Sequence, residues 1–371
     1  MSALELNWPM RTTIDRLDVS VFKIPTDGPE SDGTLEWDST TVVLVEISAG
    51  GKTGLGFTYA NKSAAVLIGE KLRNETVGAD PLDVRGIWDK LVRSIRNLGR
   101  PGVASMAIAA VDIALWDLKA TLLDLPLLKL LGQVRPGIMA YGSGGFTSYS
   151  IERLQDQLGG WADAGLRAVK MKIGHEPDQD LARVLAAREA IGPQVDLYVD
   201  ANGAYDRKQA LSQAEAFAAC GVKWFEEPVS SNDLSGLRLI RDRAPASMVI
   251  AAGEYGYDSI YFRRMLEAGA VDVLQADATR CGGITGFLEA GALCEAFHVP
   301  LSAHTAPSVH QHPCCALENA RHVEYFHDHV RLEQMLFEGA ACARGGQLRP
   351  DVSRPGLGLE FKRADADKYL V

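Results

Sequence analysis

Between residues 137 and 326 the chain alternates short apolar runs with longer stretches whose apolar residues recur at helical spacing. The helical stretches cover 150–164, 178–191, 207–220, 257–268 and 283–297. Strands separated by helices run parallel in one sheet, and eight of them favour a closed barrel over an open sheet. The predicted strands are IMAYGSG (138–144), AVKMKIG (168–174), DLYVDANG (196–203), KWFEEP (223–228), VIAAGE (249–254), VDVLQAD (271–277), VPLSAH (299–304) and HVEYF (322–326).

The N-terminal part of the chain has a different pattern, with strands first and helices after. TTVVLVEI (40–47) and GLGFTYA (54–60) flank the turn AGGKTG and predict a hairpin. Residues 63–135 have the periodicity of helices, most clearly in VRGIWDKLVRSI and ASMAIAAVDIALWDLKATLL. We therefore predict an α/β protein with an α+β domain over 1–130, a barrel domain over 131–334, and a tail over roughly 335–371 that returns to the first domain.

Composition and charge narrow the classes of function. Of the 371 residues, 47% are hydrophobic and 23% are charged, as in globular proteins with a large core. The net charge is −10, and no Lys/Arg-rich run could follow a nucleic-acid backbone. The chain has neither the roughly 20 apolar residues of a membrane span nor a secretion signal. We expect a cytoplasmic protein that binds neither nucleic acid nor membranes and whose six cysteines stay reduced.

Ionisable side chains lie at the ends of all predicted barrel strands except the first. The carboxyl ends of parallel barrel strands share one face, so side chains there can converge on one pocket. Residues two apart in a strand point the same way, so Lys170 and Lys172 share a face, as do Asp200 and Asn202. The strand-end set is Lys170, Lys172, Asp200, Asn202, Glu226, Glu227, Glu254, Asp277, His304 and Glu324.

Three of these carboxylates are candidates for a metal site. Asp200, Glu226 and Glu254 follow one another at intervals of one strand and one helix. Oxygen ligands without Cys or His suit Mg²⁺ and do not suit zinc. As an alternative, each acid alone could be the N-cap of the following helix, and each lysine alone a solvated strand end. The combination favours the metal site.

Histidines provide two further candidates. His304 could be a satisfied core histidine, but Asp277 ends the preceding strand and could orient its imidazole into the pocket. His310 and His312 lie near Cys314 and Cys315 and could suggest a soft-metal site. We do not favour that site, because two histidines two apart on a helix point to different faces.

In this order the motifs resemble those of the enolase superfamily, and within it the mandelate racemase subgroup. The resemblance covers essentially the whole chain and rests on SMAIAAVDIALWDLKA (105–120), VKMKIG, VDANG, WFEEP, AAGE, QAD, SAH and VEYF. It implies a modified (β/α)7β barrel with an N-terminal α+β capping domain and one essential Mg²⁺ per subunit. The implied chemistry is removal of the proton α to a carboxylate, through an enediolate.

Site roles follow from the resemblance, residue by residue. It implies Asp200, Glu226 and Glu254 as metal ligands, Lys172 as the base on one face of the substrate, and Lys170 against the substrate carboxylate, where it lowers the pKa of Lys172. It also implies His304 with Asp277 as the acid/base pair on the other face, Glu324 as the partner of the enediolate oxygen, and Asn202 as a contact to the α-substituent. The sixth strand ends in ADATRCGG without a lysine, which departs from the muconate-lactonizing and dipeptide-epimerase branch.

Several reactions remain open. Protonation of a β-hydroxyl by His304 would dehydrate a sugar acid (an aldonate or aldarate) to a 2-keto-3-deoxy acid, which is our prediction because most of the subgroup are acid-sugar dehydratases. Alternatives are a racemase or epimerase, a lactone cycloisomerase, and a catalytically idle barrel that serves as a scaffold. The resemblance also implies a homo-oligomer, either a dimer or an octamer.

Substrate selection is expected to lie in the first domain. The segments TDGPESDGTLEWDS (26–39) and TYANKS (58–63) are predicted to be flexible loops that close over the pocket. Arg280 and Tyr255 lie just beyond strand ends. They could bind a distal carboxylate or hydroxyl groups, or only form a surface ion pair and packing contacts.

Overall fold

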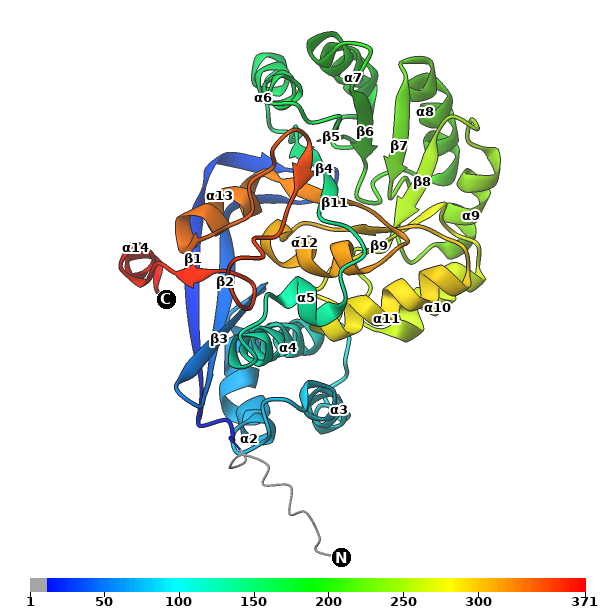
Figure 1. The fold of residues 1–371 in the computed structure, drawn as a ribbon. Coiled ribbons are helices and arrows are strands. Elements are labelled where there is room, and N and C mark those ends of the chain that lie inside the picture. The colour runs from blue at the N-terminus through cyan, green and yellow to red at the C-terminus, as the bar shows by residue number, and fades with distance from the viewer. Residues whose placement is uncertain (1–11) are drawn as a thin grey trace, which may run out of the picture.

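A computed structural model describes residues 12–371, and its largest unit is a barrel of eight parallel strands (Figure 1). Each strand pairs with the next along the chain, and the last pairs with the first, which closes the barrel as predicted. The strands are β4 (Ile138–Gly144), β5 (Ala168–Lys172), β6 (Asp196–Asp200), β7 (Val222–Glu226), β8 (Val249–Ala252), β9 (Val273–Ala276), β10 (Leu301–Ala303) and β11 (Ala320–Phe326).

Seven helices connect these strands, which gives the predicted (β/α)7β order. They are α6 (Ile151–Asp163), α7 (Pro177–Ile191), α8 (Arg207–Ala219), α9 (Leu234–Arg243), α10 (Ser259–Glu267), α11 (Gly283–Ala296) and α12 (Pro307–Ala316). Five correspond to the predicted helical stretches. The sequence pattern had not marked α9 or α12 as connecting helices: α9 is short, and α12 is buried along nine of its ten residues and contains Pro313, so it lacks an amphipathic pattern.

The N-terminal domain is an antiparallel sheet covered by helices. Its strands are β1 (Arg16–Ser31), β2 (Glu36–Ala49) and β3 (Lys52–Tyr59). Its helices are α1 (Ser63–Leu67), the π-helix η1 (Ile68–Leu72), α2 (Arg73–Thr76), α3 (Val84–Ser94), α4 (Val103–Leu122) and α5 (Leu127–Leu131). Gly54 and Gly56 allow α4 to approach β3, because a Cβ at Gly56 would lie 2.2 Å from the carbonyl oxygen of Ala110.

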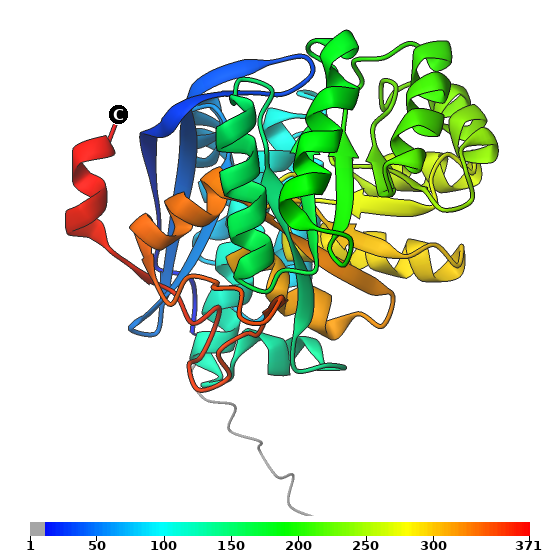
Figure 2. The same ribbon diagram turned by 90° about the horizontal axis from the view of Figure 1, so that it is seen from above.

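The segment 26–39 is not the loop that its composition predicted. β1 continues to Ser31 and β2 begins at Glu36, with an irregularity in their pairing between Pro25 and Glu30. The end of this hairpin (residues 26–39, hereafter the ribbon) reaches the loop after β4, where Thr147 donates its backbone N–H to Ser31 over 2.9 Å. Figure 2 shows the ribbon extending from the N-terminal sheet toward the barrel helices. Its Asp, Gly and Pro residues are typical of loops, but contacts with the barrel hold it as strand.

The C-terminal segment crosses back to the N-terminal sheet. It contains α13 (His327–Leu336), β12 (Phe337–Glu338), β13 (Gln347–Leu348), β14 (Glu360–Phe361), α14 (Arg363–Ala366) and the 3₁₀ helix η2 (Asp367–Tyr369). β13 adds to the edge of β4, and the Val371 N–H donates to the carbonyl of Val21 over 3.0 Å. In Figure 1 the red end of the chain accordingly lies beside the blue sheet.

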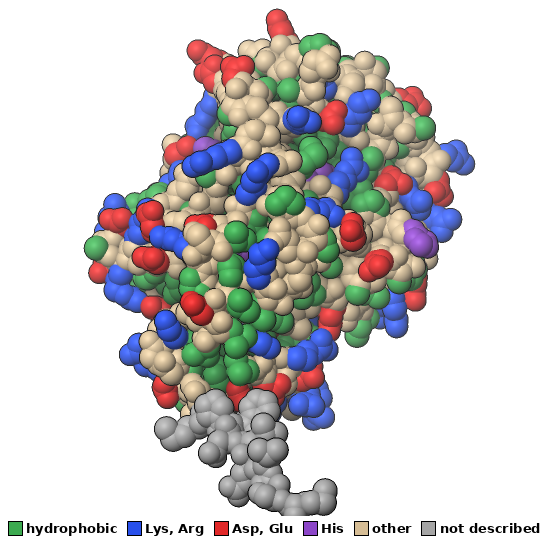
Figure 3. All heavy atoms as spheres, in the orientation of Figure 1, with side chains coloured by type: hydrophobic (Ala, Val, Ile, Leu, Met, Phe, Trp, Pro, Cys, Tyr) green, Lys and Arg blue, Asp and Glu red, His purple; other side chains and the backbone are tan. Residues whose placement is uncertain are grey.

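Two further features are the distribution of charge on the surface and the length and polarity of the helices. On the face in Figure 3, acidic and basic side chains are interspersed rather than segregated. Across residues 12–371, every helix is too short or too polar to cross a lipid bilayer.

Candidate active site

Three acidic side chains meet at the carboxyl ends of neighbouring barrel strands. Asp200 ends β6, Glu226 ends β7, and Glu254 lies two residues beyond β8. Each offers a carboxylate oxygen within 4.8 Å of the oxygens offered by the other two, and all three side chains are buried. The register pairs Asp200 with Glu226 directly. The structure therefore brings together the three acids that the sequence predicted as metal ligands.

These acids do not cap the helices that follow them. The N-caps of α8, α9 and α10 are Asp206, Asp233 and Asp258, and each accepts a hydrogen bond from a backbone N–H in the first turn of its helix. The capping alternative therefore does not apply to Asp200, Glu226 or Glu254.

The excess of negative charge among the three acids fits a site for a divalent cation. Burial, together with the charge of Asp200, raises the pKa of Glu226 well above its usual value. Within residues 12–371, Glu254 Oε2 accepts no hydrogen bond, although His304 Nε2 lies 3.3 Å away. Adjacent buried carboxylates repel one another, and a hard cation bound by their oxygens would relieve this repulsion.

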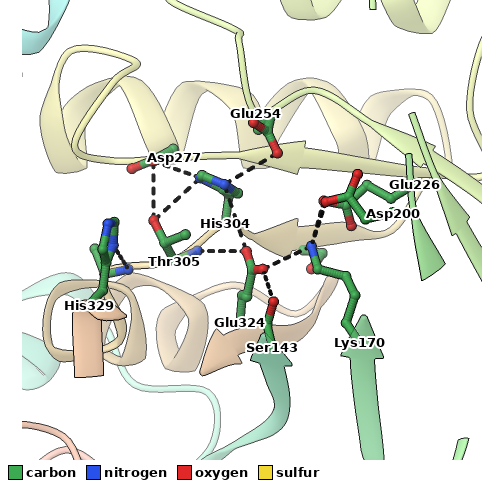
Figure 4. Close-up of polar contacts among 12 residues, drawn as sticks. Ser143, Lys170, Asp200, Glu226, Glu254, Asp277, His304, Thr305, Glu324 and His329 are labelled. Atoms are coloured by element: carbon green, nitrogen blue, oxygen red, sulfur yellow. Dashed lines mark hydrogen bonds and ion pairs between the residues drawn. The ribbon is translucent and has the colours of Figure 1, made fainter. Parts of the chain in front are cut away.

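Two buried lysines border the acids. Lys170 is fully buried, and its Nζ lies 2.5 Å from Glu226 Oε1 and 2.8 Å from Glu324 Oε1. Lys172 Nζ lies 2.5 Å from Asp200 Oδ2 and 3.1 Å from Asn202 Oδ1. Figure 4 shows Lys170 reaching this acidic group from β5.

The pKa of Lys172 differs from the sequence-based expectation. Burial lowers the pKa of this ammonium group and Lys170 adds repulsion, but the attraction of Asp200, Glu254 and Glu226 together outweighs both, so the pKa is raised above its ordinary value. The same pair lowers the pKa of Asp200: burial raises it, and the charges of Lys172 and Lys170 outweigh burial. Lys172 is thus an ammonium group for as long as Asp200 is its counter-ion.

A histidine and an aspartate form a pair on β9 and β10. His304 Nδ1 lies 2.9 Å from Asp277 Oδ2 (Figure 4), and Thr279 donates both its backbone N–H and its hydroxyl to Asp277 Oδ1 at 2.7 Å. Burial raises the pKa of Asp277, but the hydrogen bond and the charge of His304 together outweigh burial. The pKa is therefore lowered, and the carboxylate stays ionised. An ionised Asp277 fixes the Nδ1–H tautomer of His304 and leaves Nε2 directed toward Glu254.

A second buried histidine joins the two strand ends that carry this pair. His310 Nε2 accepts the backbone N–H of Ala278 at 2.7 Å, and its Nδ1 lies 2.8 Å from the carbonyl oxygen of Thr305. These backbone groups are adjacent in sequence to Asp277 and His304. Sequence reasoning had considered His310 only as a metal ligand, because its partners lie on separate strand ends and no local pattern links them.

Glu324 lies between the lysines and the histidine. Its Oε1 accepts the hydroxyl of Ser143 at 2.6 Å, and its Oε2 accepts the backbone N–H of Thr305 at 3.1 Å. Burial raises the pKa of Glu324, but Lys170 and His304 outweigh burial and hold the pKa at about 2. Ser143 was missed by the sequence analysis, since a serine at the end of the first strand has no distinguishing pattern.

An aromatic layer lies beneath the charged residues inside the barrel. Tyr141, Tyr198 and Trp224 are buried and within 6.5 Å of one another, with Tyr198 and Trp224 stacked. Trp224 donates its indole N–H to Glu226 Oε2 over 2.8 Å, and Lys170 Nζ lies 5.6 Å from the Tyr141 ring. The layer closes the barrel below the site and excludes water from the charged groups.

Backbone strain is concentrated at the same strand ends. Of six non-glycine residues with positive φ among residues 12–371, four follow strands of the site: Asn202, Glu227, Thr305 and Ala306. Such conformations cost free energy and persist where surrounding contacts determine them.

A cavity of about 410 Å³ opens above the site. The barrel contributes Lys172, Asn202, Glu254, Tyr255, Arg280, His304, Thr305, Phe326 and His329, and the N-terminal domain contributes Asp32, Leu35, Trp37, Ser39, Thr40, Thr41, Tyr59, Ala60 and Asn61. Of the predicted site residues, Lys172, Asn202, Glu254 and His304 line this space. Lys170, Asp200, Glu226, Asp277 and Glu324 are buried behind them and make no part of its lining.

Arg280 and Tyr255 both line the cavity, so neither is only a surface residue. Arg280 lies 3.3 Å from Glu254 Oε1 and 3.5 Å from Asp277 Oδ2, and its guanidinium stacks over the Tyr255 ring at 5.2 Å. Arg280 is therefore held by two carboxylates of the site.

A second cluster of possible metal ligands lies at the ribbon. Asp27, Glu30 and His327 offer ligand atoms within 4.8 Å of one another. Asp27 is already engaged by His327 Nε2 at 2.9 Å and by Arg153 at 3.1 Å, and it joins the ribbon to the barrel. The sequence analysis had not identified this cluster.

Comparison with known families and structures adds independent evidence. The N-terminal domain of the mandelate racemase/muconate lactonizing enzyme family matches residues 22–132, and the enolase C-terminal domain-like family matches residues 153–366. The chain belongs to the mandelate racemase/muconate lactonizing enzyme family. This assignment confirms the resemblance to the enolase superfamily that the strand-end motifs indicated.

Three proteins illustrate the range within the mandelate racemase/muconate lactonizing enzyme family. A 3,6-anhydro-alpha-L-galactonate cycloisomerase of Streptomyces coelicolor is 33% identical, with 94% of this chain and 98% of that protein covered. A mandelate racemase/muconate lactonizing enzyme-like protein from Rubrobacter xylanophilus is 55% identical, with a TM-score of 0.95 and coverage of 96% and 99%. The L-talarate/galactarate dehydratase from Salmonella typhimurium, liganded with Mg and L-lyxarohydroxamate, is 28% identical, with a TM-score of 0.88 and coverage of 98% and 94%.

Proposed function

We propose that this protein is a Mg²⁺-dependent lyase that dehydrates a sugar acid to a 2-keto-3-deoxy acid. The observation that carries the proposal is the placement of Lys172 and His304 on non-adjacent strands around one cavity, beside a buried triad of carboxylates. A base and an acid so arranged can remove the C2 proton and protonate the C3 hydroxyl. Loss of water leaves an enol that tautomerises to the keto acid.

Asp200, Glu226 and Glu254 are the proposed ligands of the metal ion. Their oxygen-only donor set suits Mg²⁺, and the relative from Salmonella typhimurium is liganded with Mg. When bound there, Mg²⁺ supplies positive charge to the substrate carboxylate, whose negative charge grows as the α-proton leaves.

Lys172 is the proposed base. Its Nζ pairs with Asp200, which is also a proposed metal ligand. A cation held by Asp200 would weaken the attraction that raises the pKa of Lys172. Lys170, fully buried nearby, adds repulsion that favours the neutral amine. A neutral Lys172 exposed to the cavity can take the proton from C2.

His304 is the proposed acid that protonates the leaving hydroxyl. Asp277 holds its ring through Nδ1, and His310 bonds the backbone next to each residue of the pair. Glu324, held by Ser143 and Lys170, is proposed to contact the enediolate oxygen, and Asn202 the α-substituent. Because Lys170 and Glu324 lie behind the cavity wall, these contacts require small movements of side chains on substrate binding.

Cycloisomerisation is a second candidate reaction. The observation in its favour is the 33% identical relative named as an anhydrogalactonate cycloisomerase. The same two residues serve both reactions, since opening a ring ether β to the carboxylate also needs a proton removed at C2 and one delivered to the leaving oxygen. The substrates differ, because one is an anhydro-aldonate and the other an open-chain sugar acid, so the reactions are separable by experiment.

Proton NMR in D₂O of the Mg²⁺-loaded protein tests both candidates. The substrates are C5 and C6 aldonates, aldarates, their lactones and anhydro-aldonates. We expect loss of the C2 proton signal and formation of a 2-keto-3-deoxy acid from one compound or a small group. His304→Asn should retain C2 exchange catalysed by Lys172 and lose dehydration. Exchange with no compound, by protein that binds Mg²⁺, would support the idle-scaffold alternative.

A further inference from the structure

The wall of the cavity opposite the metal site comes from the N-terminal domain and carries one charged group, a carboxylate. The ribbon supplies Asp32, Leu35, Trp37 and Ser39 to this wall. Thr40 and Asn61 add neutral polar groups from β2 and from the turn after β3. Among the residues of 12–371 that the N-terminal domain contributes to the lining, Asp32 is the one ionised side chain.

The position of Asp32 is fixed by the docking of the ribbon. A Cβ on the next residue, Gly33, would lie 2.4 Å from the carbonyl oxygen of Ala201, so the ribbon tip touches the loop directly after Asp200. Thr147 donates its hydroxyl to the backbone carbonyl of Asp32 over 2.8 Å. Asp32 is thus held close to the barrel residues of the site and is not on a free loop.

One oxygen of the Asp32 carboxylate is available to a ligand. Oδ1 accepts the backbone N–H groups of Thr34 at 2.6 Å and Leu35 at 2.8 Å, which forms a local turn. Within residues 12–371, Oδ2 has no such partner, and the residue is 8% exposed and lines the cavity. A carboxylate oxygen in this position accepts hydrogen bonds from hydroxyl groups and repels another carboxylate.

The cavity offers no uncommitted cation to a second carboxylate. Among its described lining residues, the permanent cations are Lys172 and Arg280. Lys172 belongs to the reacting end, and Arg280 is already paired with Glu254 and Asp277. His329 stacks on the Tyr59 ring at 3.4 Å, and burial lowers its pKa to about 3, so it is neutral.

We propose that Asp32 is a specificity-determining residue that selects monocarboxylic sugar acids, so that the substrate is an aldonate or an anhydro-aldonate and not an aldarate. The inference rests on the proposed function, which places the reacting carboxylate at the metal site and the rest of the sugar chain toward the ribbon. The hydroxyl groups of that chain then meet Asp32, Ser39, Thr40 and Asn61. A terminal carboxylate would instead face Asp32 without a counter-charge.

The test compares matched substrate pairs that differ only at the terminal carbon. The panel holds all C5 and C6 aldonates and the aldarate of the same configuration, such as galactonate with galactarate. For each pair, kcat/KM for dehydration and the rate of C2 exchange are measured by NMR with wild type and variants. We expect wild type to favour the aldonate of its best pair by roughly tenfold or more, since like charges across a partly desolvated gap cost at least about 1.4 kcal/mol.

Asp32→Asn is the informative variant. Its side-chain oxygen can still accept the N–H groups of Thr34 and Leu35, so the turn is retained while the charge is lost. We expect the aldonate preference to shrink about tenfold, chiefly through a lower KM for the aldarate. Glu36→Gln is the matched control: it removes an exposed carboxylate from the same ribbon outside the cavity lining, and the preference should stay unchanged.

Each outcome bears on a different claim. A wild-type preference for aldarates, or an Asp32→Asn preference equal to that of wild type, overturns the role of Asp32 and leaves the proposed dehydration intact. Exchange with no member of either series, and with none of the anhydro-aldonates, overturns the proposed function and this inference with it. Equal changes in Asp32→Asn and Glu36→Gln would mean that the overall charge of the ribbon, and not Asp32, sets the preference.

Discussion

Two walls of the same cavity hold their polar groups in different ways. On the barrel wall, ionised side chains are buried and neutralise one another, as Lys170 does between Glu226 and Glu324. On the wall from the N-terminal domain, neutral polar groups and the single carboxylate of Asp32 face the cavity. The barrel wall rests on strands that pair all the way round, whereas the ribbon is held by a few contacts at its tip.

We relate this difference between the walls to two tasks: catalysis at the barrel wall and substrate selection at the ribbon. Acid–base groups need fixed positions and pKa values set by their neighbours, which strand ends over a packed aromatic layer provide. Selection of a substrate needs a surface that can change without disturbing those groups. Substitutions on the barrel wall should therefore lower kcat, and substitutions on the ribbon should change KM and substrate preference.

Lys172→Ala should have the largest effect and would test the barrel wall directly. Removal of the proposed base should lower kcat by roughly 10³-fold or more, since general-base catalysis contributes about 10² to 10⁴ and the amine also orients the substrate. Steady-state kinetics measure the loss, and circular dichroism shows whether the variant is folded. Lys223→Ala, at an exposed position of β7, is the control and should retain wild-type turnover. Full turnover by Lys172→Ala would refute the assignment of the base.

His310→Phe tests whether the barrel wall depends on positioning. Phe fills the buried space but cannot bond Ala278 or Thr305, so Asp277 and His304 should lose their alignment. We expect kcat to fall about 10- to 100-fold with little change in KM, because misplaced catalytic groups lose transition-state stabilisation. The acidic and basic limbs of the pH–rate profile should also move, which simple destabilisation would not cause.

Two further variants accompany His310→Phe. His310→Gln is a partial rescue, and His175→Gln is a control. Gln can restore one of the two backbone hydrogen bonds, so it should recover part of the lost kcat. His175 is exposed on the surface, and its substitution should change nothing. If His310→Phe has wild-type kinetics and an unshifted pH profile, His310 does not position the pair.

Gly33→Ala tests the ribbon wall. The added Cβ would lie 2.4 Å from the carbonyl of Ala201, so the ribbon tip must lift. We expect KM to rise about tenfold with a smaller change in kcat, because closure over the substrate is weakened while the barrel residues stay in place. Gly160→Ala, where the new methyl group meets no atom within 4 Å, is the matched control. A large loss of kcat in Gly33→Ala at unchanged KM would show that the two walls are not separable.

The smallest expected effect concerns the pH dependence of stability, which should differ between the two regions. Burial raises the pKa of Asp112, on the helix that joins the N-terminal domain to α11, to about 7. Below about pH 4 this group is neutral in both the folded and the unfolded chain. Above it, the unfolded chain ionises first, so the free energy of unfolding falls as the pH rises toward 7.

Asp112→Asn should reduce this fall by about 1 kcal/mol between pH 6 and pH 7.5, as urea unfolding would measure. Asn can still accept the N–H of Thr285, which Asp112 bonds at 2.9 Å. Lowered carboxyl pKa values on the barrel wall, as at Glu324, act in the opposite direction: their contribution is lost only at acidic pH. An unchanged slope in Asp112→Asn would show that this carboxyl does not control the stability in that range.

The sequence by itself determined the barrel and the residues at its strand ends. The alternation of strands and helices is a local pattern, and the carboxyl ends of parallel barrel strands share one face, so the sequence alone places Asp200, Glu226 and Glu254 together. Their order along the chain also carried the resemblance to the family.

Tertiary structure alone decided which of those residues face the cavity and what holds them. Lys172 and His304 line it, whereas Lys170 and Asp277 lie behind, although all four lie within a barrel strand or directly after one. The contacts of His310 with Ala278, and of the ribbon with the Ala201 loop, join residues far apart in the sequence. Periodicity and composition describe neighbours along the chain, so they cannot predict contacts between distant residues. The ribbon has the composition of a loop, and only its docking on the barrel makes it a wall of the site.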